Sequence, residues 1–263
     1  ANINPTIAYR FSETLSVGAG FNYYISRANL VRRPVFGPGG PTEVEMDGSG
    51  NGVGYNLGVQ WKMSDTVTFG ATYRSAVDVT YDGELQVGPL EDDAETDIEY
   101  PRVVSLGAAW QTTPKLTLQV AAEWTEWSVN DTPTITHDIA PGMLPPPMRS
   151  PVVEDLSWDD SWLYMAGAEY ELNETWTLRG GYGYMETPVP AGTADPSLPG
   201  GDVHAAAVGV GYQCTENLTL DAAVQVARGK ERSLTSNKAQ TFQYAGDYEY
   251  WAVNYSVGMR YRF

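Results

Sequence analysis

The chain has 263 residues, 42% of them hydrophobic, and a mean hydropathy of −0.32. No run of about 18 apolar residues is present, which excludes a transmembrane helix but not a membrane β-barrel, whose strands are apolar on one face only. The net charge of −17 argues against nucleic acid as a partner, because phosphates would be repelled. The single cysteine, Cys214, excludes a disulfide framework and a thiolate metal cluster.

A short polar turn that runs directly into alternating apolar residues recurs five times in the chain. Ser, Asn, Asp and Pro suit such reversals, because their side chains or fixed φ stabilise a turn. A propeller also repeats at roughly 50 residues, but it needs four short strands in each repeat, and here only two long ones fit. The turns are Ser12–Leu15, Ser64–Val67, Thr113–Leu116, Asn173–Trp176 and Thr215–Leu218.

The segments after these turns alternate between apolar and polar or small residues, as strands with one apolar face do. We expect residues 66–81 to form one continuous strand whose apolar face points outward: Val67, Phe69, Ala71, Tyr73, Val77, Val79 and Tyr81. The opposite faces of this and other strands put six charged residues inside: Arg74, Asp78, Glu123, Glu169, Arg179 and Asp221. They are expected to form paired ladders or to contact a ligand.

Strand length separates a membrane barrel from a soluble sandwich. These runs reach about 11 to 16 residues, longer than the usual 5 or 6 of globular strands and long enough to cross a bilayer. Aromatic residues gather near the predicted strand ends, where interfacial girdles form. The long connections are expected on the side opposite the turns, at 29–51, 83–98, 131–157, 188–202 and 233–246. The acidic residues of segment 83–98 are expected to be solvated loop, or to bind divalent cations at a lipopolysaccharide surface: Glu91, Asp92, Asp93, Glu95 and Asp97.

Counting around the turns gives eleven strands in a single barrel domain, residues 1–263. The tail from Tyr255 to Phe263 places an apolar residue at every second position, resembling the C-terminal signal for barrel insertion. Bacterial single-chain barrels have an even strand number, and an open edge is not viable in lipid. We therefore expect N-terminal strands beyond those counted.

Several short motifs of the sequence resemble the FadL/TodX family of outer-membrane transporters. The resemblance rests on Asn4–Arg10, on Tyr73-Arg74-Ser75 with Tyr81-Asp82-Gly83, and on the stretch from Gly167 to Pro190 followed by Leu198-Pro199 and Asp202. It implies a fourteen-stranded antiparallel barrel with an N-terminal hatch, of which this chain would carry the last eleven strands. It departs from the family where Val203 and His204 follow Asp202, because the family often has an arginine there.

The resemblance implies passive uptake of long-chain fatty acids or aromatic hydrocarbons through a plugged barrel with a lateral exit. An apolar pocket suits such ligands, because it removes their surface from water. Arg74 or Arg179 is a candidate for binding a ligand carboxylate, which arginine can bind in bidentate fashion. Met143, Leu144 and Met148 are candidates for capturing an apolar ligand outside. Inward glycines either let the sheet bend or leave room for a plug and ligand.

The rival interpretations are a general diffusion porin or structural barrel and an outer-membrane hydrolase. A hydrolase needs a nucleophile with a base, and the only histidines, His137 and His204, have no patterned serine partner. No cofactor, metal site or catalytic residue is predicted. The expected partners are a hydrophobic ligand, outer-membrane lipid and lipopolysaccharide, with no nucleic acid and a monomeric state. The expected location is the bacterial outer membrane.

Overall fold

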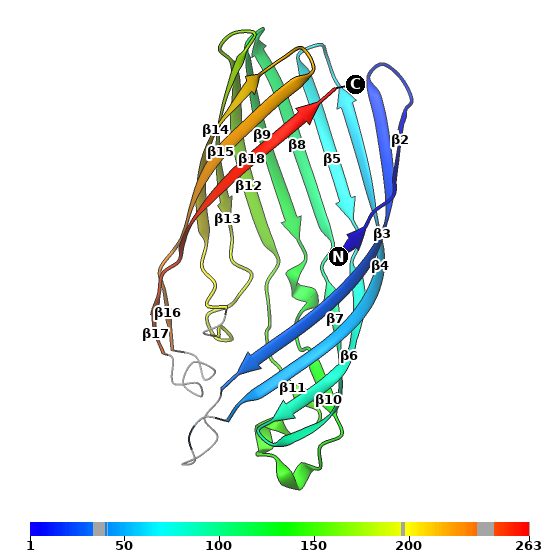
Figure 1. The fold of residues 1–263 in the computed structure, drawn as a ribbon, viewed down its shortest axis with the longest axis vertical. Helices are drawn as coiled ribbons and strands as arrows, with labels where there is room; N and C mark the ends of the chain where they lie inside the picture. The colour runs from blue at the N-terminus through cyan, green and yellow to red at the C-terminus, as the bar shows by residue number, and fades with distance from the viewer. Residues whose placement is uncertain (34–39, 41, 196–197, 236–244, 263) are drawn as a thin grey trace.

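The computed structural model describes residues 1–263 except 34–39, 41, 196–197, 236–244 and 263 (Figure 1). Phe263 and parts of the predicted connections 29–51, 188–202 and 233–246 therefore lie outside the described residues. Within the described part no helix is long and apolar enough to cross a membrane. The elements are almost all strands, with three short 3₁₀ helices, η1 (Trp127–Val129), η2 (Pro141–Met143) and η3 (Pro146–Met148).

Eleven strands run side by side in the described wall. Their order is β2-β3-β4-β5-β8-β9-β12-β13-β14-β15-β18, and every pairing is antiparallel. This confirms the predicted antiparallel barrel strands and their number. The bounds are β2 (Thr6–Arg10), β3 (Leu15–Arg32), β4 (Val44–Lys62), β5 (Val67–Arg74), β8 (Val103–Thr113), β9 (Leu116–Thr125), β12 (Ser161–Glu171), β13 (Trp176–Met185), β14 (Val203–Gln213), β15 (Leu218–Gly229) and β18 (Trp251–Tyr261).

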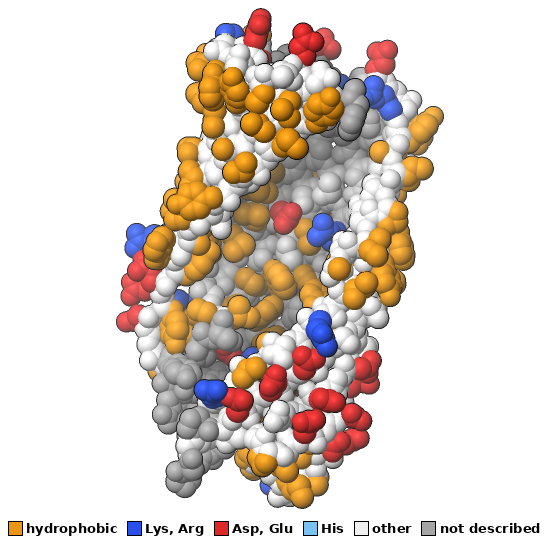
Figure 2. Space-filling model, viewed as in Figure 1, with side chains coloured by type: hydrophobic (Ala, Val, Ile, Leu, Met, Phe, Trp, Pro, Cys, Tyr) orange, Lys and Arg blue, Asp and Glu red, His pale blue; other side chains and the backbone are white. Residues whose placement is uncertain are grey.

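The curved sheet does not close on itself. In the described residues β18 pairs only with β15, and β2 pairs only with β3, which leaves a seam between them (Figure 1). Beside β2 the short β1 (Asn2–Ile3) continues along β3. Figure 2 looks through this seam into a hollow, with hydrophobic side chains gathered on the outer flanks of the wall.

Five turns at one end of the wall share a single hydrogen-bonding device. The side-chain oxygen of the first turn residue accepts the backbone N–H groups two and three residues later, as Ser12 Oγ does from Thr14 and Leu15 at 3.2 and 3.0 Å. The same pattern recurs at Ser64, Thr113, Asn173 and Thr215. Donors that the reversal would leave unpaired are thereby satisfied. The predicted side-chain stabilisation of these turns is confirmed.

The outward face of the wall is apolar and uncovered. Phe69, Val120, Leu178 and Val257, all predicted to face lipid, are 39%, 59%, 44% and 86% exposed. Such an exposed belt would be unstable in water and is typical of a bilayer-facing surface. Rings pair near the turn end, as Trp61 with Phe69 and Trp176 with Tyr212, which is the position of an interfacial girdle.

The prediction that residues 66–81 form one strand with a single outward apolar face is wrong beyond Tyr73. The strand breaks at Ser75–Ala76, and the returning strand breaks at Pro101–Arg102. Beyond the breaks, β6 (Val77–Val87) and β7 (Leu90–Tyr100) form a hairpin whose faces are reversed. Val77, Val79 and Tyr81 are buried on the inner side, against residues such as Tyr24 and Ala28.

The ladder between β4 and its neighbour explains this reversal. On β4, Asn56 pairs with Arg74 and Ser49 pairs with Asp82. The chain between these two pairs is one residue longer from Arg74 to Asp82 than it is along β4. A one-residue shift sends side chains to the opposite face. Asp78, predicted to face inward, is consequently exposed opposite Glu99 on the outside.

Two predicted long connections are largely regular structure. Segment 83–98 is the β6–β7 hairpin with a tight turn at Gly88, and its acidic residues occupy β7 rather than a loop. Much of segment 29–51 belongs to the extended ends of β3 and β4. Segment 131–157 holds β10 (Thr134–His137), η2, η3 and β11 (Val152–Val153), with β10 paired to β7. A further small hairpin, β16 (Arg232–Leu234) and β17 (Gly246–Tyr248), projects beyond β15.

Candidate functional site

A cavity of about 630 Å³ lies on the inner side of the wall where β5 gives way to β6. The strand break creates it, because the reversal turns Val77 and Val79 inward beside Arg74 at the end of β5. Tyr24 and Ser26 from β3, Tyr100 from β7, Glu123 from β9 and Trp127 from η1 also line it. We call this space the Arg74 cavity. It combines apolar walls with one cationic and one anionic side chain.

The side chain of Arg74 makes no hydrogen bond or ion pair with any residue that the structure describes. Its five N–H donors are therefore free for an anion in the lumen. Glu123, in contrast, accepts a hydrogen bond of 2.7 Å from Ser105 Oγ on the neighbouring strand. The bond fixes one carboxylate oxygen of Glu123 to the wall.

A chain of three hydroxyls lies beside the Arg74 cavity, and two of them, on Ser26 and Tyr100, belong to residues that line it. Tyr81 Oη lies 2.6 Å from both Ser26 Oγ and Tyr100 Oη, linking β3, β6 and β7. Tyr81 and Tyr100 lie beyond the apolar belt, in the β6–β7 hairpin, whose outer face is acidic. Burial raises the pKa of the Tyr81 hydroxyl.

Arg179, the second predicted carboxylate ligand, is occupied by the protein's own acids. Its Nε donates to Glu169 and its Nη1 to Asp221, both at 2.6 Å. A Cβ at Gly211 would lie 2.9 Å from Asp221 Oδ1, so this glycine makes room for the pair. We call the three charged residues the Arg179 triad. The triad carries a net negative charge, which disfavours a further carboxylate.

Small residues line a second cavity of about 670 Å³ nearer the turns. Four of the inward glycines predicted to bend the sheet or leave space lie here: Gly18, Gly58, Gly70 and Gly107. Their lack of side chains leaves the lumen wide at this level. The role of that space stays a prediction.

The predicted ligand-capturing residues of the long-loop end separate in the structure. Leu144 is 4% exposed and packs with Leu85, Val87 and Ile139 in a small core, with Met148 against its edge. Met143 is 65% exposed. Of the three, Met143 alone presents most of its surface to the outside.

An arginine clasp ties three distant segments together at the same end. Arg32, at the end of β3, lies 2.8 Å from Glu154 and 3.8 Å from Asp195. Thr193 Oγ1 donates to the Leu156 carbonyl at 2.5 Å, and Val189, Ala194 and Leu234 form a small buried cluster. The segments after β11 and β13 are thus attached to β3 across the mouth of the wall.

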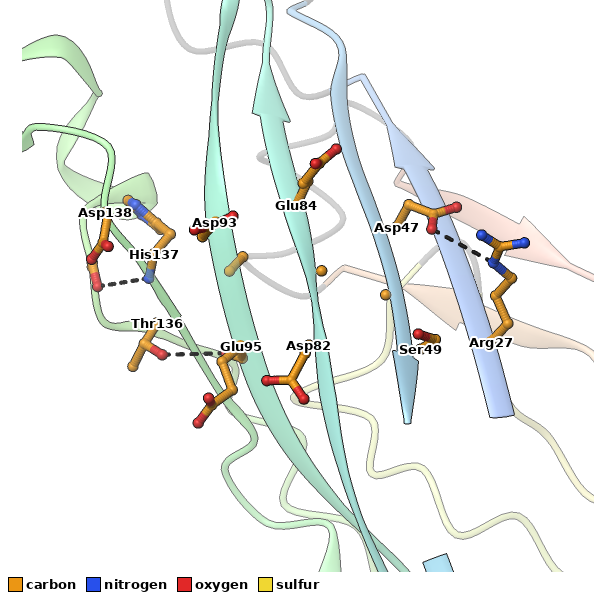
Figure 3. Close-up of a pocket in the computed structure, with 14 residues that line it drawn as sticks. Arg27, Asp47, Ser49, Asp82, Glu84, Asp93, Glu95, Thr136, His137 and Asp138 are labelled. Carbon is orange, nitrogen blue, oxygen red and sulfur yellow. Dashed lines mark hydrogen bonds and ion pairs between the residues drawn. The ribbon is translucent and has the colours of Figure 1, made fainter. Parts of the chain in front are cut away.

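The outer face of β4, β6, β7 and β10 is strongly acidic. Figure 3 shows the side chains of Asp47, Asp82, Glu84, Asp93 and Glu95 along neighbouring strands, with Arg27 at one side, 3.8 Å from Asp47. Acidic side chains also gather over this region in Figure 2. Among the described residues no three His, Cys, Asp or Glu side chains converge as metal ligands.

Sequence reasoning missed the residues that complete the Arg74 cavity. Tyr24, Ser26 and Tyr100 carried no functional signal, and Val77 and Val79 were assigned to the lipid face. Pro101 was an available signal, because proline cannot donate to a ladder and marks an interruption.

The comparisons with known proteins agree with this architecture. The profile of the family described as outer membrane protein transport protein (OMPP1/FadL/TodX) matches residues 1–263. A long-chain fatty acid transport protein of Escherichia coli O6:H1 (strain CFT073) is 20% identical over 293 residues, which is 95% of this chain and 64% of that protein. The chain thus spans less than two thirds of the length of this curated relative.

Solved structures show the same fold. A Pseudomonas aeruginosa FadL homologue matches with a TM-score of 0.82 at 20% identity, over 99% of this chain and 67% of that one. The Pseudomonas putida toluene transporter TodX matches with a TM-score of 0.70 at 17% identity, over 100% and 69%. The family consists of transporters of the bacterial outer membrane. With its whole length matched by the family profile, this chain belongs to the OMPP1/FadL/TodX family of outer membrane transport proteins.

Proposed function

We propose that this protein carries hydrophobic molecules passively across the outer membrane and that the Arg74 cavity binds them. The observation that carries the proposal is the coexistence of inward-facing Val77 and Val79 with the guanidinium of Arg74, which has no partner in the part of the chain that the structure describes. Apolar walls remove an alkyl chain or ring from water, and a free arginine can bind a carboxylate through two hydrogen bonds. The relatives named as fatty acid and toluene transporters support this class of ligand.

Between those two ligand types, the free charge of Arg74 favours an acid with a long apolar chain. Arg74 is exposed in the open lumen, so a neutral hydrocarbon makes no use of its guanidinium, whereas a carboxylate gains two charge-assisted hydrogen bonds from it. Arg179 is the poorer candidate for the same role, since both neighbouring acids already bind it.

Binding of a 16-carbon fatty acid and of toluene to the purified protein in detergent tests this proposal. Arg74→Ala should weaken fatty acid binding about tenfold or more, the usual effect of losing a charge-assisted hydrogen bond, and leave toluene binding unchanged. Arg74→Lys should retain part of the affinity. Equal fatty acid affinity in Arg74→Ala and the wild type would overturn the role of Arg74.

The remaining assignments follow from the same scheme. Met143 contacts the ligand first, supported by Leu144 and Met148, and the seam between β2 and β18 is closed by further N-terminal strands with a hatch. The protein is a monomer surrounded by lipid and lipopolysaccharide and performs no catalysis.

A general porin would show large, steady conductance in planar bilayers, whereas a plugged transporter would be nearly silent.

A further inference from the structure

Glu123 lines the Arg74 cavity together with Val77 and Val79, and its second carboxylate oxygen has no partner among the described residues. It is an acid placed where an anionic ligand head would bind. Such a group costs affinity for a plain carboxylate, so its presence needs a ligand that makes use of it.

Register places Glu123 near Arg74. Arg74 on β5 pairs with Val103 on β8, and Glu123 on β9 pairs with Ser105 on β8, two residues further along. Strands lie about 4.8 Å apart and rise about 3.3 Å per residue, so the two Cα atoms are roughly 12 Å apart. The long side chains shorten this gap, yet no ion pair joins them within 4.0 Å.

We propose that Glu123 is a specificity residue, which selects acyl chains whose head carries one carboxylate and a nearby hydroxyl. This inference rests on the proposed function. The carboxylate binds Arg74, and the hydroxyl donates to the free oxygen of Glu123, while the Ser105 bond holds Glu123 in place. A head with two carboxylates is excluded, because the second would face Glu123 as a like charge.

Three 12-carbon-chain ligands test the inference: dodecanoate, 3-hydroxydodecanoate and dodecylmalonate, whose head has two carboxylates. The wild type should bind the hydroxy acid about tenfold more tightly than dodecanoate, as expected for a hydrogen bond to a charged acceptor, and dodecylmalonate most weakly. Glu123→Leu should bind dodecanoate and its hydroxy form equally. Glu123→Gln keeps a neutral acceptor, so it should accept dodecylmalonate and retain part of the hydroxyl preference.

The outcomes separate the two proposals. If dodecanoate binds in an Arg74-dependent way but the ratio between hydroxy and plain acid is the same in the wild type and Glu123→Leu, the role of Glu123 is rejected and the proposed function stands. If neither the 12-carbon acids nor the 16-carbon fatty acid bind the wild type, the Arg74 cavity does not bind acyl chains, and the proposed function itself is rejected. As the folding control, each variant should show the same heat-dependent mobility on gels as the wild type. Ser105→Ala should reduce the preference for the hydroxy acid over dodecanoate, because it releases Glu123.

Discussion

Two lumen arginines differ in their surroundings, and this difference assigns them different roles. Arg74 has no described partner, whereas the Arg179 triad links β12 and β13 with β15 across the intervening β14 by way of two ion pairs. Free donors suit transient binding of a ligand. Donors satisfied by the protein suit structure, and removing the shared cation leaves two acids on one wall.

Arg179→Ala should therefore lower the free energy of unfolding of the barrel by about 1 kcal/mol, the upper range for partly exposed pairs. Arg74→Ala is the matched control and should leave stability unchanged. Urea unfolding in detergent, followed by tryptophan fluorescence, measures both. Equal losses in the two variants would show that the ion pairs of the Arg179 triad contribute nothing specific.

At the scale of elements, the reversed β6–β7 hairpin defines the cavity. Its inner valines approach the backbone of β4 closely, and three glycines allow this. A Cβ at Gly52 would lie 2.5 Å from a Val77 methyl and 2.8 Å from the Asp78 carbonyl, and Gly50 and Gly54 are similarly close to β6 or Ser75. Any side chain at these positions displaces β6 from β4.

Gly52→Val should lift β6 off β4 and open the Arg74 cavity. Amide hydrogen exchange along Val77–Val87 should become faster, because the hairpin loses its packing. Gly58→Ala is the control, since a Cβ there meets nothing nearer than 3.9 Å and should leave exchange unaltered. Slow exchange retained in Gly52→Val would mean that the close packing on β4 does not hold the hairpin.

The sequence predicted the strands, turns and outward faces of the wall well, because period-two alternation is a direct consequence of strand geometry. In the strand that begins at Val67 the prediction holds as far as Tyr73. It failed at Ser75 because Val77, Val79 and Tyr81 continue the same alternation, and a single extra residue leaves no trace in the pattern. The predicted inward positions of Arg74, Glu123, Glu169, Arg179 and Asp221 agree with the cavity and ion pairs that contain them. Which arginine stays unpaired depended on side-chain geometry, which alternation does not encode.

At the scale of the whole molecule, the Arg32 clasp joins segments far apart in the chain. Arg32 and Glu154 are 122 positions apart. Neighbouring Arg33 makes a local pair with Glu43, at 2.6 Å and ten positions away, within its own β3–β4 hairpin. Of these two arginines, Arg32 is therefore the one that joins loops from distant parts of the described chain.

Arg32→Ala should free the segments at 151–160 and 188–195 and make them more susceptible to protease added to intact cells. Arg33→Ala should have little effect, because its ion pair is exposed and local. Cleavage rates from mass spectrometry of the released peptides decide between them. The clasp has no closing role if both variants are cut at the wild-type rate.

The breaks in the two neighbouring strands, at Ser75 and Pro101, also determine which deletions and insertions the β6–β7 hairpin tolerates. Every residue from Val77 to Val87 is paired with a residue of β7 in one continuous register, because the chain is shifted by the same amount in both strands of the hairpin. Deleting one residue from only one of the two strands would turn the acidic side chains of that strand inward and its valines outward. Matched deletions in both strands would keep each side chain on its present face. Peptide tags grafted at Gly88 should consequently be displayed without disturbing transport, as long as the two offsets below them stay equal.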